Sequence, residues 1–165
     1  MKAVVVYESH WGNTAAVARA IAEGIGPEVP ALSTSEATDT AIAGADLIVA
    51  GAPLLGFRLP NENMLDGVRS AGDKAPSPPD LSHPLLRTWL AALPGGHGRS
   101  AAFETRVRVS PGGATGTILS ELERSGYQKL AKGERFVVKG RYGPLRDGEL
   151  ERARKWGEAL AQAMG

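Results

Sequence analysis

Hydrophobic positions along this chain follow two alternating spacings, one typical of buried strands and one typical of the helices that cover them. Short apolar runs rich in β-branched residues occur at 4–7, 46–51, 100–103 and 136–138. Between them, apolar residues recur every three or four positions, as in the set Val17, Ala18, Ile21, Ala22 and Ile25. Strands that alternate with helices predict an α/β fold built on a parallel sheet.

Helix ends are marked by capping residues and glycines. We expect a short helix at 38–43, a helix that Ser82 caps, one at 116–124, and a final helix that Asp147 caps. Residues 28–32 form a weaker strand because Pro30 interrupts it, which is tolerated at the edge of a sheet.

One long segment, 53–83, lacks a regular pattern. It holds several prolines and glycines, and the run Lys74–Asp80 is incompatible with a helix or a central strand. Long loops of this kind are either functional lids or disordered segments, and the sequence leaves both alternatives open.

The turn after the first strand carries the clearest chemical signal. A strand that feeds a helix through a short turn aims the unpaired N–H groups of the helix at one point, together with the positive end of its dipole. Ser9, Asn13 and Thr14 add side-chain donors, and no Lys or Arg lies between Glu8 and Thr14. The turn therefore predicts a phosphate site that works by hydrogen bonds and dipole. The simpler alternative is that Ser9 and Thr14 are only helix-capping residues.

This turn resembles the phosphate loop of the flavodoxin family, which reads Ser/Thr-x-Thr-Gly-Asn-Thr after the first strand. The chain has Ser9-His10-Trp11-Gly12-Asn13-Thr14 and departs from the pattern at Trp11. The likeness extends along most of the chain, although only this loop is a specific motif. It implies one domain over 1–165, a doubly wound five-stranded parallel sheet in the order 2-1-3-4-5, and an edge position for the strand with Pro30.

The resemblance also implies non-covalently bound FMN. Its phosphate would lie at Ser9, His10, Trp11, Gly12, Asn13 and Thr14. Its ring would lie between Pro53, Leu54, Leu55, Gly56 and Phe57 on one side and Thr105, Arg106 and Val107 on the other. The redox chemistry would belong to the flavin, so no catalytic acid or base is assigned. Alternatives remain open for Phe57 as a core residue, and for Arg106 and Arg108 as solvated charges.

Composition narrows the function classes. The chain has 165 residues, no cysteine and a net charge of +1, and no run reaches membrane-spanning length. We therefore expect no nucleic-acid partner, no membrane insertion and no thiol chemistry, and the absence of a signal pattern favours a cytoplasmic location. The spacing of the three histidines suggests no metal site.

Other α/β families fail on specific residues. The chain lacks the Gly-x-x-x-x-Gly-Lys-Ser/Thr of P-loop enzymes and the Gly-x-Ser-x-Gly of α/β-hydrolases. A response-regulator receiver needs an aspartate at the end of its third strand, where this chain has Gly51-Ala52.

Three functions stay open. The first is an electron carrier that exchanges electrons with an unknown redox partner protein. The second is a small NAD(P)H-linked reductase of a quinone-like acceptor, which Arg58, Arg106 and Arg108 favour because positive charge stabilises a reduced anionic flavin. The third is a binding or regulatory protein without a working cofactor site.

Overall fold

A parallel sheet forms the centre of the computed structural model, which describes residues 1–71 and 74–165. The strand order is β2-β1-β3-β4, with β5 and β6 both beside β4, and every pairing is parallel. The strands are β1 (Ala3–Tyr7), β2 (Ala31–Ser33), β3 (Leu47–Pro53), β4 (Arg99–Val107), β5 (Gln128–Lys129) and β6 (Glu134–Val138). The predicted order 2-1-3-4-5 is confirmed, and β2, which follows Pro30, lies at an edge.

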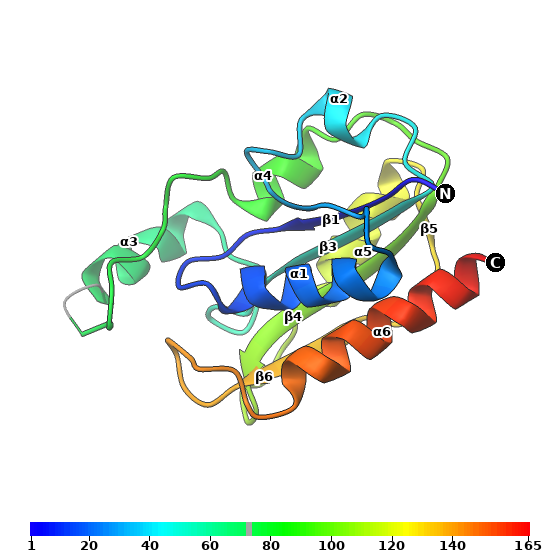
Figure 1. The fold of residues 1–165 in the computed structure, drawn as a ribbon. Helices are drawn as coiled ribbons and strands as arrows, with labels where there is room; N and C mark the ends of the chain where they lie inside the picture. The colour runs from blue at the N-terminus through cyan, green and yellow to red at the C-terminus, as the bar shows by residue number, and fades with distance from the viewer. Residues whose placement is uncertain (72–73) are drawn as a thin grey trace.

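Helices cover both faces of this sheet (Figure 1). The helices are α1 (Asn13–Ile25), α2 (Asp39–Ile42), α3 (Glu62–Ser70), α4 (Leu86–Ala91), α5 (Thr115–Arg124) and α6 (Glu149–Met164). Along β1, Val4 and Val6 face the core under α2, α4 and α5, whereas Ala3 and Val5 face the core under α1 and α6. Burial on both faces explains why the central strands are apolar at every position.

The fifth strand differs from the prediction, because it is split in two. β5 pairs with the start of β4, at Arg99 and Ser100, and β6 pairs with its end, from Phe103 to Val107. The edge strand carries more residues between these two pairings than β4 does, so its middle cannot stay in register. β4 is also longer than the run 100–103 that apolarity alone predicted.

The segment 53–83 is not wholly irregular, because α3 lies inside it. The Asn61 side chain accepts a hydrogen bond from the Met64 N–H at 3.2 Å and so caps this helix, and Val68 is its buried residue. The proximity of Gly67 and Pro60 to this helix hides its pattern in the sequence. α3 projects beyond the carboxyl ends of the strands (Figure 1). Positions 72 and 73 of the predicted loop lie outside the described residues.

Two predicted helix caps are wrong. α4 begins at Leu86, after Pro84, and Ser82 instead bonds the Asp80 carboxylate through both its N–H and its hydroxyl. α6 is preceded by Gly148 in the left-handed region, so Asp147 lies outside it. Thr38 does cap α2, through the Ala41 N–H at 3.2 Å. Among the described residues, no helix combines the length and apolarity needed to span a membrane.

Candidate functional site

A cavity of about 410 Å³ opens where the carboxyl ends of β1, β3, β4 and β6 meet. This is the edge of an open α/β sheet where ligands bind, and the volume lies within the usual range of small-molecule sites. The residues around it are Ser9, His10, Trp11, Asn13, Thr14, Pro53, Leu54, Leu55, Gly56, Met64, Val68, Thr105, Arg106, Val107, Ser110, Val138 and Arg141. The structure thus brings together all the predicted site residues except Gly12 and Phe57.

The loop from Ser9 to Thr14 leads directly into α1. Gly12 precedes the helix with φ 95°, a left-handed conformation that glycine adopts without steric cost. No side chain caps this helix end, so the first N–H groups of α1 have no capping partner among the described residues. Ser9 Oγ accepts a hydrogen bond from the Gly12 N–H at 3.1 Å, which holds the turn in shape.

The side chains of this loop have protein partners of their own. Asn13 donates to the Tyr142 carbonyl at 3.1 Å, and the hydroxyls of Thr14 and Thr105 lie 2.8 Å apart in a buried pair. Thr14 is therefore more than a helix cap, because its hydroxyl links β4 to the start of α1. The free donors that the loop offers to an anion are chiefly backbone N–H groups.

Two other segments pack against the loop. Trp11 donates from Nε1 to the Ser77 carbonyl at 3.0 Å, and its ring meets the edge of Tyr142 at a centroid distance of 4.8 Å. The Asp80 N–H donates to the His10 carbonyl at 2.7 Å. Part of the predicted 53–83 loop therefore rests on the phosphate loop.

A buried acid–base pair lies beside this loop. Glu8 and His10 side chains are each 4% exposed, with Oε2 of Glu8 2.9 Å from Nε2 of His10. Glu8 also accepts the Leu86 N–H through Oε1 at 2.8 Å, which ties β1 to the start of α4. The sequence placed His10 in a turn, and its burial could not be read from the sequence.

The β3 side of the cavity ends in a tight turn. Leu55 and Arg58 exchange backbone hydrogen bonds of 3.0 Å in each direction around Gly56 and Phe57. Gly56 has φ 50° and Phe57 has φ 69°, the pair of left-handed residues that a two-residue turn of this type needs. Phe57 is 59% exposed, so its interpretation as a core residue is wrong.

The β4 side carries a second buried acid–base pair. Glu104 is fully buried, and its Oε2 lies 3.1 Å from Nη1 of Arg106, which is 6% exposed. Oε1 of Glu104 accepts the N–H groups of Ala114 and Thr115 at 2.9 and 3.3 Å and thereby caps α5. Arg106 is thus not a solvated charge, although Arg108 is exposed.

Five residues around the cavity were not predicted. Met64 and Val68 come from α3, which the sequence analysis missed, and Ser110 follows the longer β4. Val138 and Arg141 follow β6, whose carboxyl end reaches the same edge of the sheet as those of β1, β3 and β4. That rule alone was enough to place the segment after β6 at the site.

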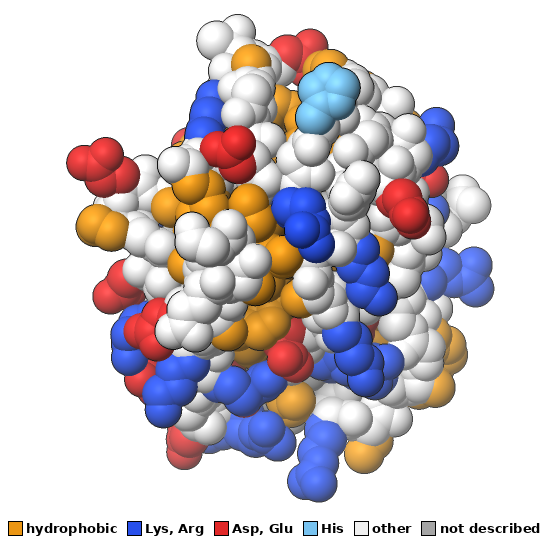
Figure 2. Space-filling view, turned by 90° about the vertical axis from the view of Figure 1, so that its right-hand side faces the viewer, with side chains coloured by type: hydrophobic (Ala, Val, Ile, Leu, Met, Phe, Trp, Pro, Cys, Tyr) orange, Lys and Arg blue, Asp and Glu red, His pale blue; other side chains and the backbone are white. Residues whose placement is uncertain are grey.

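A larger cavity, of about 660 Å³, lies at the opposite end of the sheet. Backbone from the loops 43–46 and 94–98 lines it, with Asp39 and Tyr127, whose pKa burial raises. Figure 2 views this end of the molecule, where apolar side chains gather in the middle and Lys and Arg side chains below. Size alone therefore does not single out the candidate site, whereas the helix N-terminus and the converging strand ends do.

Sequence comparisons are silent on this chain, since neither a protein-family model nor a curated protein matches it. Solved structures do match. A flavodoxin from the domain Archaea is 24% identical over 99% of both chains, with a TM-score of 0.68. Oxidised flavodoxin 1 from Bacillus cereus is 20% identical over 98% of both chains, with a TM-score of 0.66.

The flavodiiron core of Flv1 from Synechocystis also matches, at 20% identity and a TM-score of 0.64. The match covers 99% of this chain but 36% of that one, so the likeness concerns a single domain of it. At these identities the likeness establishes the arrangement of the backbone. With its strand order, its two helical layers and its cavity at the carboxyl ends, the chain has the flavodoxin-like fold.

Proposed function

We propose that this protein binds FMN non-covalently and transfers electrons through it. The observation that carries the proposal is the convergence, around one cavity, of the loop 9–14, the turn 53–56 and the strand end 105–107. The structural neighbours named as flavodoxins support the same proposal.

The residues present fit such a cofactor. Asn13, Thr14 and Ala15 are the first residues of α1, and their N–H groups would bind the phosphate, aided by the helix dipole. Leu54, Leu55 and Val107 would exclude water from the ring, because all three are apolar and line the cavity. When bound, FMN would supply the redox chemistry, and the protein would supply position and electrostatics.

The Thr14 and Thr105 hydroxyls would join the two halves of the site. One hydroxyl donates to the other across 2.8 Å, which leaves the second hydroxyl with a hydrogen for a ligand atom. A buried hydroxyl pair of this kind would orient the link between phosphate and ring.

A titration with two flavins tests the proposal. The apoprotein is titrated with FMN and with riboflavin, which lacks the phosphate, and flavin fluorescence reports binding. We expect FMN to bind more tightly, because each charge-assisted hydrogen bond to the phosphate contributes about 1.5–3 kcal/mol. Equal affinities would remove phosphate recognition, and no binding of either flavin would overturn the proposal.

The charges at the cavity favour a second candidate, an NAD(P)H-linked reductase with a small quinone-like acceptor. Arg106 and Arg141 line the cavity, and Arg58 and Arg108 are exposed on the neighbouring loops. Positive charge stabilises the negative charge that reduction adds to a flavin, and so favours two-electron transfer. Steady-state oxidation of NADH or NADPH by a quinone with the FMN-loaded protein would establish this activity. Without turnover, an electron carrier with a redox partner protein remains.

A further inference from the structure

The buried pair Glu8–His10 has one atom that the fold alone does not explain. Nδ1 of His10 is buried and has no hydrogen-bond partner among residues 1–71 and 74–165. Glu8 Oε2, although 2.9 Å from His10 Nε2, is poorly aligned with it for a hydrogen bond. Buried polar atoms without partners are uncommon in native proteins, and each points to a ligand, a proton or a functional role.

We propose that His10 is the protonatable counter-charge of the phosphate site: its imidazolium, held beside Glu8, is the form that binds the phosphate group. This inference rests on the proposed binding of FMN. His10 lies within the loop 9–14 and also lines the cavity, so its charge acts at the point where the phosphate would lie.

The loop needs a positive charge that its other residues do not supply. No Lys or Arg occurs from Glu8 to Thr14. Arg106 lines the cavity from β4, but its guanidinium is already engaged by Glu104 at 3.1 Å and by the Gly112 carbonyl at 3.0 Å. Arg141 is exposed to solvent, which weakens its field.

The sign of the effect follows from the charge of the pair. With neutral His10, an ionised Glu8 leaves one buried negative charge under the loop, which repels a phosphate dianion. With His10 protonated, the pair is neutral and Nδ1 carries a hydrogen to donate. Burial strengthens both effects, because charges interact more strongly where water is excluded. Phosphate binding and proton uptake at His10 therefore favour each other.

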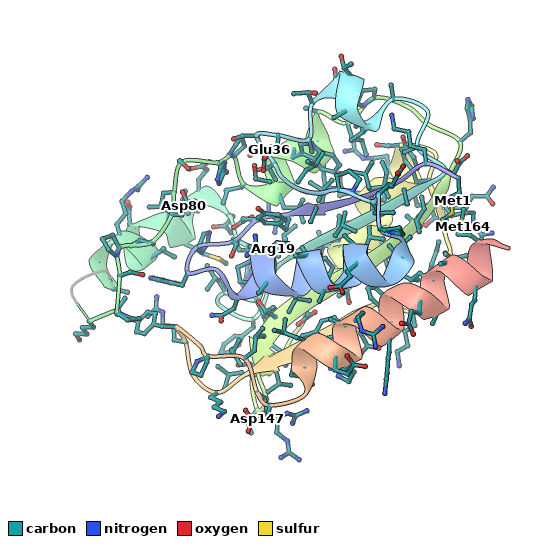
Figure 3. All side chains as sticks on the ribbon, viewed as in Figure 1. Met1, Arg19, Glu36, Asp80, Asp147 and Met164 are labelled. Atoms are coloured by element: carbon teal, nitrogen blue, oxygen red, sulfur yellow. The ribbon has the colours of Figure 1, made fainter. Side chains whose placement is uncertain are left out.

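Other ionisable groups near His10 are already paired. Asp80 and His83 face it from the segment between α3 and α4, and with Glu8 they line a small cavity of about 20 Å³. Asp80 Oδ2 lies 3.3 Å from His83 Nε2, and hydrogen bonds from Ser82 lower the pKa of Asp80. Glu36, beyond His83, has its pKa lowered by the Ser33 N–H. Figure 3 labels Asp80 and Glu36 on this side of the sheet.

Nuclear magnetic resonance of the histidine ring nitrogens tests the proposal directly. The chain has three histidines, so the spectrum is simple, and the signals lost in His10→Gln assign those of His10. We expect both His10 nitrogens to carry hydrogen in the FMN complex at about pH 7.5, where an ordinary histidine is mostly neutral. The riboflavin complex should show less of this form. A neutral His10 in the FMN complex would overturn the proposal.

Titrations with FMN provide an independent readout. Above about pH 7 the phosphate is already dianionic, so a fall in FMN affinity with rising pH reports the protein. We expect this fall in the native chain, and about tenfold weaker FMN binding in His10→Gln with riboflavin binding unchanged. His83→Gln is the matched control and should behave like the native chain.

The outcomes separate the two proposals. If FMN binds more tightly than riboflavin but His10→Gln changes neither the affinity nor its pH dependence, only the role of His10 fails. If the native chain binds no FMN, both fail.

Discussion

Two sides of the cavity use the same device with different cations. On the β1 side, Glu8 pairs with His10, and on the β4 side, Glu104 pairs with Arg106, each at a strand end. In both, the glutamate also accepts backbone N–H groups at the start of a helix, α4 in one case and α5 in the other. Each pair therefore holds a helix against a strand.

The difference lies in the proton. A guanidinium stays charged at every physiological pH, whereas an imidazole gains and loses its charge near neutrality. The β4 pair is a permanent structural link, and the β1 pair is a link whose charge a ligand can change. The titratable pair lies where an anion is expected, and the permanent pair lies where the flavin ring is expected.

Breaking the permanent pair should have the largest effect. Glu104→Gln leaves Arg106 buried without its carboxylate and should lower the free energy of unfolding by about 3–5 kcal/mol. Urea denaturation measures it. Glu121→Gln is the control, because its partner Arg124 is 61% exposed, and should cost about 0–1 kcal/mol.

The same change at Glu8 sharpens the comparison. Glu8→Gln should cost less than Glu104→Gln, because His10 can become neutral and the amide oxygen can still accept the Leu86 N–H. Equal losses at the two positions would show that His10 behaves like a fixed charge, and would contradict the distinction between the pairs.

Removal of the hydroxyl that joins the two sides should affect the ligand more than the fold. Thr14→Ala should weaken FMN binding about tenfold or more, equal to about 1.4 kcal/mol, while the backbone donors of α1 remain. Fluorescence titration measures it, with Thr117→Ala on the exposed face of α5 as control. A loss of stability without a separate loss of FMN affinity would restrict Thr14 to a structural role.

A smaller effect is expected from the exposed arginine at the cavity. Arg141→Gln should lower the second one-electron potential of bound flavin by a few tens of millivolts, since about 59 mV corresponds to 1.4 kcal/mol for one electron. Spectroscopic reductive titration gives the potential. Arg19→Gln on α1, labelled in Figure 3, removes the same charge from an exposed site that does not line this cavity and should leave the potential unchanged.

A third glutamate extends the comparison to pH. Burial opposes ionisation of Glu149, but hydrogen bonds from Arg152 and the Val137 N–H keep its pKa below the ordinary 4.5. Ionised Glu149 therefore adds stability above about pH 4.5, which is lost as the pH falls through the lowered pKa. Because Arg152 is 39% exposed, we expect about 1 kcal/mol or less, measured as the difference between native chain and Glu149→Gln across this range. A constant difference would contradict the assignment.

The sequence predicted those parts of the fold and of the candidate site that depend on local pattern. Alternating apolar runs placed the strands, and the turn Ser9–Thr14 placed one end of the cavity. α3 was missed because Gly67 and nearby prolines outweighed its Asn61 cap. Which side chain faces which across the sheet has no local signal, so the buried partners of His10 and Arg106 required the structure.

The two cavities at opposite ends of the sheet allow the most direct test of the central claim, that the α1 end binds the FMN phosphate. Backbone amide signals are followed by nuclear magnetic resonance during addition of FMN, riboflavin or inorganic phosphate. We predict that Asn13 and Thr14 shift with FMN and phosphate but little with riboflavin, and that Leu55 and Val107 shift with both flavins. Shifts confined to the opposite cavity, around Gly96 and Tyr127, or no shift at Asn13 and Thr14 with FMN, would contradict it.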